Sequence, residues 1–133
     1  MTNITINAKN VKEILKFFRI SARYGINIVG PAGVGKVALI EKAAREISDD
    51  VIVINPMTAS SYLLDESKVN GAIIILEEFN SFSKGEQEKA IQLMKKYQEE
   101  TYFIAVCNTW DELDIDQFIS NRLIHLKWEI KES

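Results

Sequence analysis

The sequence predicts a single α/β domain of three layers, in which a five-stranded parallel sheet carries helices on both faces. Short β-branched and apolar runs alternate along the chain with longer segments whose apolar residues recur at helical spacing. Strands that alternate with helices imply right-handed crossovers, which place helices over both faces of a parallel sheet. The length of 133 residues suits one domain with one core, and no repeat or linker interrupts it.

The first half of the chain is expected to form two helices and two strands. After an extended start at 2–6, residues 10–23 carry apolar side chains at helical spacing with lysines and arginines between them. Residues 26–30 follow as the first buried strand. A second amphipathic helix is expected over 36–47, and the β-branched run 51–54 is typical of a strand that is buried on both faces.

The second half is expected to add three strands and further helices. Residues 57–68 have the weakest pattern and predict a short helix, whereas 72–76 is the most hydrophobic run and predicts the third strand. Ser83, with Glu86 three residues later, predicts a capping box for a helix that runs to about Glu100. The remaining predicted elements are a strand at 101–107, a short helix around 115–119 and a strand at 123–130.

The turn after the first strand has the composition of a phosphate-binding loop. It approaches the pattern G-x-x-x-x-G-K-[ST], in which backbone N–H groups, a lysine and a helix N-terminus converge on phosphate oxygens. Val37 departs from this pattern, because it cannot supply the hydroxyl that binds Mg²⁺. A glycine-rich turn with a chance lysine is the alternative. The loop residues are Gly30, Pro31, Ala32, Gly33, Val34, Gly35, Lys36 and Val37.

A pair of carboxylates, Glu77 and Glu78, follows the third predicted strand. In parallel sheets ligands bind at the carboxyl ends of the strands, so these acids are expected near the phosphate loop. One carboxylate is suited to a position near Mg²⁺ and the next to polarising an attacking water. The alternative is two exposed acids at a strand end.

The order of these features resembles the nucleotide-binding core of AAA+ ATPases. The resemblance covers about residues 10–130, and it implies the three-layer αβα P-loop NTPase fold with ATP and Mg²⁺ as ligands. It rests on the phosphate loop, on 73–78 with its paired acids, on a strand that ends in Asn (103–108), and on an arginine after a short helix (120–122).

The resemblance also implies roles for individual residues. Lys36 and the loop would bind the phosphates, Glu77 would lie on the metal side, and Glu78 would be the catalytic glutamate. Asn108 would be sensor 1, and Arg122 would be an arginine finger that reaches the nucleotide of a neighbouring subunit. Asn108 could instead form a turn, and Arg122 could be a solvated cation at a helix end.

Three further residues outside this set have polar or aromatic side chains of interest. Asn55, which precedes Pro56, is either a turn former or the polar residue that restrains the catalytic glutamate in many family members. His125, in an apolar strand, is expected to be a surface or core histidine and not a base, and Trp128 is expected to pack in the core.

The chain departs from the family pattern at three places. Val37 removes a metal ligand, and Glu77 stands where the family usually has the shorter Asp. We expect the longer Glu77 to reach Mg²⁺ directly and offset Val37. The family's helical lid, with its sensor 2 arginine, is not expected, so residues 1–133 are interpreted as one AAA+-like domain.

These observations lead to a main hypothesis and two alternatives. The main one is an ATP-binding AAA+-like ATPase module that hydrolyses ATP at an intersubunit site and drives assembly or remodelling of a partner. The expected assembly is a homo-oligomer, a ring or filament, or a complex with a partner protein. The alternatives are an ATP- or ADP-binding sensor or scaffold with negligible hydrolysis, and a small P-loop kinase.

Composition sets limits on the environment and partners. With 16 basic and 19 acidic residues the formal net charge is −3, which gives no general attraction to nucleic acid. Cys107 is the single cysteine, so no intramolecular disulfide can form, and a cytoplasmic location is expected. No apolar run approaches the ~20 residues of a membrane span.

Overall fold

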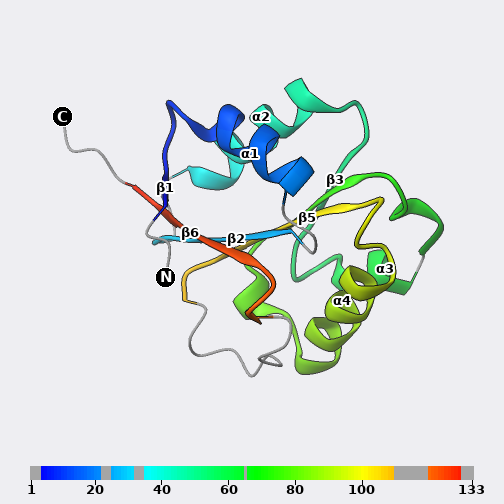
Figure 1. Cartoon of the computed structure of the whole chain (residues 1–133). Helices are drawn as coiled ribbons and strands as arrows, with labels where there is room; N and C mark the ends of the chain where they lie inside the picture. Colours follow the sequence, from blue (N-terminus) through cyan, green and yellow to red (C-terminus); the bar gives the residue numbers. More distant parts are fainter. Residues whose placement is uncertain (1–3, 22–24, 32–34, 65, 110–119, 130–133) are drawn as a thin grey trace.

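Six parallel strands form one sheet in the part of the chain that the structure describes (Figure 1). The computed structural model describes residues 4–21, 25–31, 35–64, 66–109 and 120–129. The strands are β1 (Thr5–Ile6), β2 (Ile26–Val29), β3 (Val51–Ile54), β4 (Ile73–Leu76), β5 (Tyr102–Cys107) and β6 (Ile124–Trp128). Their order across the sheet is β1-β6-β2-β5-β4-β3.

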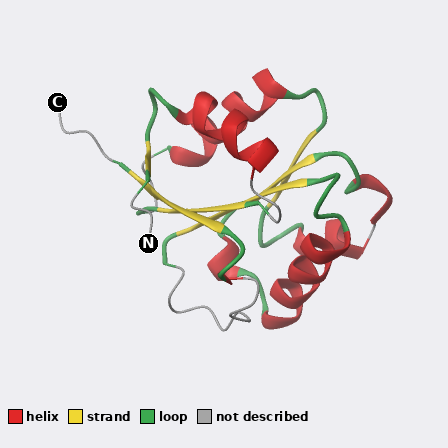
Figure 2. Ribbon diagram, viewed as in Figure 1, coloured by secondary structure: helices red, strands yellow, loops and turns green. Residues whose placement is uncertain are grey.

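Helices cover both faces of this sheet, which confirms the predicted three-layer α/β fold (Figure 2). The helices are α1 (Val11–Ser21), α2 (Lys36–Ile47), α3 (Ala59–Leu64) and α4 (Lys84–Lys96), with the short 3₁₀ helices η1 (Glu66–Lys68) and η2 (Phe79–Ser81). Alternate residues of each strand point to opposite faces. In β4, Ile73 and Ile75 therefore pack with α1 and α2, whereas Ile74 and Leu76 pack with α3 and α4.

The prediction of five strands is wrong by one, because the extended start of the chain joins the sheet. Thr5 pairs with Lys127 and Ile6 with Trp128 in parallel register, and Ile6 is fully buried. The backbone N–H of Lys127 donates to the Ile4 carbonyl, and that of Glu129 donates to the Ile6 carbonyl. Two residues are too few to show a strand period, so this pairing depends on tertiary contact.

The predicted helices agree with the structure except at their ends. The capping box of α4 is present, because the Ser83 hydroxyl accepts from the Glu86 N–H and the Glu86 carboxylate accepts from the Ser83 N–H. This helix ends at Lys96 and not near Glu100, since residues 97–100 form turns. The short helix predicted around 115–119 lies outside the described residues.

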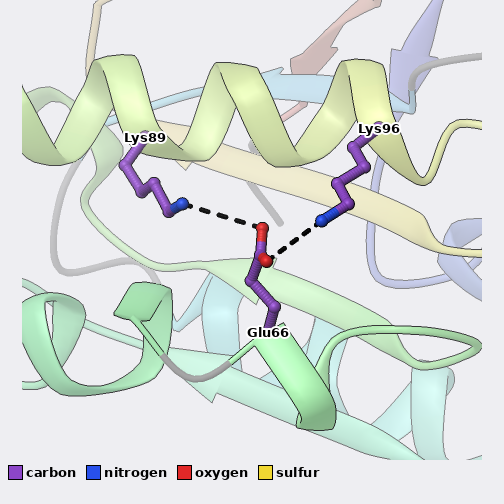
Figure 3. A network of polar contacts seen from close by, with 3 residues as sticks. All are labelled: Glu66, Lys89 and Lys96. Carbon is purple, nitrogen blue, oxygen red and sulfur yellow. Dashed lines mark hydrogen bonds and ion pairs between the residues drawn. The ribbon is translucent and has the colours of Figure 1, made fainter.

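An ion-pair cluster joins η1 to α4 (Figure 3). The Glu66 carboxylate lies 3.1 Å from the Lys96 ammonium and 3.6 Å from that of Lys89. A second contact joins α3 to α4, because the Ser60 hydroxyl donates to the Glu86 carboxylate at 2.7 Å. These contacts hold α3 and η1 against α4.

The Glu66 cluster predicts an acid-sensitive contribution to stability. The hydrogen bond from Lys96 holds the pKa of Glu66 below its ordinary value of 4.5, and the charges of Lys96 and Lys89 act in the same direction. A lowered folded-state pKa means that the stabilisation is present above pH 4.5 and is lost as the pH falls through the folded-state pKa. The denaturation midpoint of Glu66→Gln is therefore expected to lie below that of the unsubstituted chain near neutral pH and to match it in acid.

Urea denaturation across this pH range measures the difference between the two proteins. Glu88→Gln, on the exposed side of α4, removes the same charge and is the control. Because the cluster lies at the surface, added salt is expected to shrink the Glu66→Gln difference. A difference that persists in acid would contradict this interpretation.

No helix among the described segments combines the length and apolar character needed to cross a membrane.

Candidate functional site

A cleft of about 190 Å³ opens at the carboxyl ends of β2, β5 and β4, three adjacent strands of the sheet. Glu77 and Glu78 come directly after β4, and Asn108 comes directly after β5. The cleft therefore brings together six of the site residues that the sequence predicts, namely Gly35, Lys36, Val37, Glu77, Glu78 and Asn108. Its lining residues are Gly35, Lys36, Val37, Ala38, Glu77, Glu78, Val106, Cys107 and Asn108.

Two glycines of the loop are required by the local geometry. Gly30 lies against Trp128, and a Cβ atom at position 30 would lie 2.8 Å from the Trp128 Cβ. Gly35 has a φ of 74°, in the left-handed region, and directly precedes α2. That helix has no side-chain cap and no acid in its first turn, so its N-terminal N–H groups are available to an anion at the cleft. Ala32, Gly33 and Val34 lie outside the described residues.

Lys36 is buried at the start of α2, and its ammonium donates to the Pro31 carbonyl at 2.8 Å. Burial lowers the pKa of Lys36 from its ordinary value, while Cys107 and Glu78 act in the opposite direction. The Glu78 carboxylate is therefore close enough to influence the ammonium across the cleft. A phosphate group beside Lys36 would compensate for the desolvation of its charge.

The acid pair is oriented by a sharp backbone turn. Glu78 has φ 53° and ψ 49°, the one non-glycine residue with positive φ among those the structure describes. This conformation costs about 1–2 kcal/mol for a residue with a Cβ. Phe79 is fully buried and stacks edge-on with Phe82 at 5.3 Å, so burial of this pair holds the turn in place. Glu78 is left exposed and Glu77 half-buried at the cleft.

Asn80 is a residue of the site that the sequence reasoning missed. Its side-chain oxygen accepts a hydrogen bond from the Asn108 N–H at 3.2 Å, so it ties the turn that carries the acids to the end of β5. Gln87 on α4 supports the same turn by donating to the Phe79 and Phe82 carbonyls. Asparagine is common in turns, and its sequence context here carries no signal of this contact.

Asn55 and Arg122 lie outside the lining of this cleft. The side-chain oxygen of Asn55 accepts from the N–H groups of Met57 and Thr58, which supports its interpretation as a turn former. Arg122 is exposed in the turn before β6. The structure thus places the phosphate-loop lysine, the acids and Asn108 together, and it places Arg122 elsewhere on the subunit.

The donor set fits Mg²⁺ as a partner of phosphate oxygens. Within the described residues, no group of three or more His, Cys, Asp and Glu side chains could hold a metal ion. Mg²⁺ in nucleotide sites is commonly bound by one or two carboxylates together with phosphates and waters. Glu77 and Glu78 beside Lys36 meet this requirement, whereas Val37 presents only methyl groups to the cleft.

Comparison with known families gives one match that covers most of the chain. The sequence model described as "ATPase family associated with various cellular activities (AAA)" matches residues 26–126, from β2 into β6. The chain belongs to the AAA family. This match gives it an ATP-binding AAA module, in agreement with the resemblance noted in the sequence. No curated protein matches the sequence.

Solved structures share the fold at low sequence identity. The P-loop NTPase domain of an Escherichia coli sigma-54 activator has a TM-score of 0.60 at 12% identity, over 90% of this chain and 98% of that one. RuvB T158V of Thermotoga maritima has a TM-score of 0.62 at 18% identity, and the match covers 91% of this chain and 44% of the RuvB chain. Caenorhabditis elegans PCH-2 has a TM-score of 0.54 at 14% identity, and the match covers 95% of this chain and 40% of the PCH-2 chain. The chain thus spans less than half the length of the RuvB and PCH-2 chains.

Proposed function

We propose that this AAA chain binds ATP with Mg²⁺ at the cleft and hydrolyses it, using a residue from a neighbouring subunit. The observation that carries the proposal is the convergence of Lys36, the pair Glu77 and Glu78, and Asn108 on one cleft beside a helix N-terminus. A cation for the phosphates, carboxylates for a metal and a water, and a polar sensor are the parts that phosphoryl transfer to water requires.

The chemistry assigned to each side chain follows from its position. Lys36 exchanges the Pro31 carbonyl for phosphate oxygens, and the first N–H groups of α2 bind the same phosphates. Glu78 accepts a proton from the attacking water, and Asn108 orients that water or the γ-phosphate. Mg²⁺, when bound, neutralises charge on the phosphates, and Glu77 would hold it.

Arg122 is proposed to act on the site of a second subunit. It is exposed and does not line the cleft of its own chain, so a nucleotide that it contacts would be that of a neighbour. A subunit that carries its finger away from its own site associates head to tail, as a ring or a filament. Such an oligomer, alone or in a complex with a partner protein, would use the hydrolysis of ATP to assemble or remodel its partner.

Substitution of Lys36 tests the phosphate-binding half of the proposal. Lys36→Ala removes a charge-assisted hydrogen bond, worth about 1.5–3 kcal/mol, so the Kd for ATP is expected to rise about 10- to 150-fold. Titration with a fluorescent ATP analogue measures this change. Lys42→Ala, on the exposed side of the same helix, is the control and should leave the Kd unchanged. Equal effects of both substitutions would contradict a phosphate site at Lys36.

Val37 favours a second candidate function, a nucleotide-binding sensor or scaffold with negligible hydrolysis of ATP. Thr has nearly the shape of Val and adds the missing hydroxyl. The Val37→Thr substitution therefore tests the contribution of that hydroxyl alone. If Glu77 offsets Val37, Glu77→Asp is expected to lower turnover about 10-fold or more in the unsubstituted chain and much less in the Val37→Thr variant. Additive effects in this double-mutant cycle would contradict the compensation. Turnover that appears only with Val37→Thr would favour the scaffold.

A further inference from the structure

A chain of polar contacts, buried at Asn27 and Cys107 and half-buried at His125, crosses three adjacent strands of the sheet. Asn27, in the middle of β2, is fully buried. Its side-chain oxygen accepts from the Cys107 thiol at 3.1 Å, and its amide nitrogen lies 3.1 Å from Nδ1 of His125. The other ring nitrogen of His125, Nε2, lies 2.6 Å from the Ser120 carbonyl oxygen. The contacts therefore run from β5 through β2 and β6 to the turn before β6.

The hydrogen-bond pattern assigns the protons along this chain. The Asn27 amide nitrogen can only donate, so Nδ1 of His125 accepts and Nε2 carries the hydrogen that is donated to Ser120. Burial raises the pKa of Cys107 to about 12, which keeps its thiol protonated as a donor to Asn27. Each of these three contacts therefore pairs one donor with one acceptor.

The two ends of the chain lie at different functional places. Cys107 lines the cleft and directly precedes Asn108. Ser120 stands two residues before Arg122 in the turn that leads to β6. Neither Asn27 nor His125 lines the cleft, so neither side chain is placed to touch a nucleotide in its own subunit.

Apolar side chains at positions 27 and 125 would pack against the neighbouring residues without needing hydrogen-bond partners. Ile26 and Ile28, on either side of Asn27, are fully buried apolar residues. The feature that the polar pair adds is a short hydrogen bond to a main-chain carbonyl of the turn that carries Arg122. Apolar side chains could not make this bond, which restrains the turn in direction as well as distance.

We propose that Asn27 and His125 are positioning residues that hold the Ser120–Arg122 turn in a fixed position relative to the cleft. They thereby determine where Arg122 is presented to the neighbouring subunit. This inference rests on the proposed hydrolysis with Arg122 in trans. A defect at His125 then impairs the neighbour's site and leaves the subunit's own ATP binding intact.

His125→Phe is the first test, because it keeps a ring and removes both hydrogen bonds. Misplacement of a catalytic group by about 1 Å costs about 10²-fold, so kcat is expected to fall about 100-fold while the Kd for an ATP analogue stays within about twofold. His125→Gln keeps an N–H that can reach the Ser120 carbonyl, and it is expected to retain more turnover. Thermal denaturation checks that each variant is folded, and His125→Leu, which also removes both hydrogen bonds, replaces His125→Phe if the latter does not fold.

Mixed assemblies separate positioning in trans from a defect within the subunit. Glu78→Gln subunits bind ATP without turnover but carry an intact finger, so mixing them with His125→Phe subunits is expected to restore turnover about 10-fold or more. Subunits with both Glu78→Gln and Arg122→Ala are the matched control and should give no rescue.

Three results would overturn the inference. These are full turnover by His125→Phe alone, a lack of rescue by Glu78→Gln subunits, or equal rescue by the control subunits that lack Arg122. Absence of turnover in the unsubstituted chain is distinguishable from these, because it is measured before any variant is made. That result would contradict the proposed function itself, and with it the proposed role of Arg122.

Discussion

Glu78→Gln is expected to lower ATP turnover by about 10²- to 10⁴-fold, because the amide cannot accept the proton of the attacking water. Glu78 lies exposed at the cleft next to Lys36, where its carboxylate can contact a water without blocking the phosphate loop. The substitution keeps the size of the side chain and its unusual backbone conformation. Binding of ATP should therefore persist, so that kcat falls while the Kd changes by about twofold or less.

Phosphate release measured alongside nucleotide titration separates these two quantities. Glu100→Gln, exposed just before the amino end of β5 and away from the cleft, removes the same charge and is the control. Unchanged turnover in Glu78→Gln would rule out this residue as the base. Loss of ATP binding in the same variant would instead indicate a role in holding the nucleotide or its metal.

Phe79→Ala is expected to lower the free energy of unfolding by about 3–5 kcal/mol, the range for deletion of a buried aromatic ring. Phe79 is fully buried between the sheet and α4, and its edge-on contact with Phe82 is lost as well. Because this ring anchors the turn at Glu78, turnover is expected to fall even under conditions where the variant is fully folded.

Phe17→Ala is the matched control for this prediction. Phe17 on α1 is 64% exposed and keeps one edge-on contact with Phe18, so its removal should cost about 1.5 kcal/mol or less. Urea denaturation gives both values. A loss at Phe79 no larger than that at Phe17 would contradict the anchoring role of the buried ring.

The main features of the fold could be predicted from the sequence because the central strands are buried on both faces. Runs such as 73–76 and 102–107 are almost entirely apolar, and the helices between them have a regular apolar stripe. The capping box at Ser83 and Glu86 identified the start of α4 correctly. The two-residue strand β1 was beyond this reasoning, since it exists through its pairing with β6.

The cleft was predictable in outline but not in its local geometry. That Lys36, Glu77, Glu78 and Asn108 meet follows from their place at the ends of parallel strands. The left-handed backbone at Glu78 and the contact of Asn80 with Asn108 depend on how the turn packs. No local pattern encodes such contacts, because they join residues that are distant in sequence or strained by their neighbours.

The order of strands in the sheet has a consequence for synthesis of the protein. The strand that carries the phosphate loop, β2, pairs only with β5 and β6, whose residues are made about 75 to 100 positions later. On the ribosome, β2 therefore emerges without either hydrogen-bonding neighbour. The cleft is lined by residues from position 35 to Asn108, so it can form only after β5 and Asn108 have also left the ribosome.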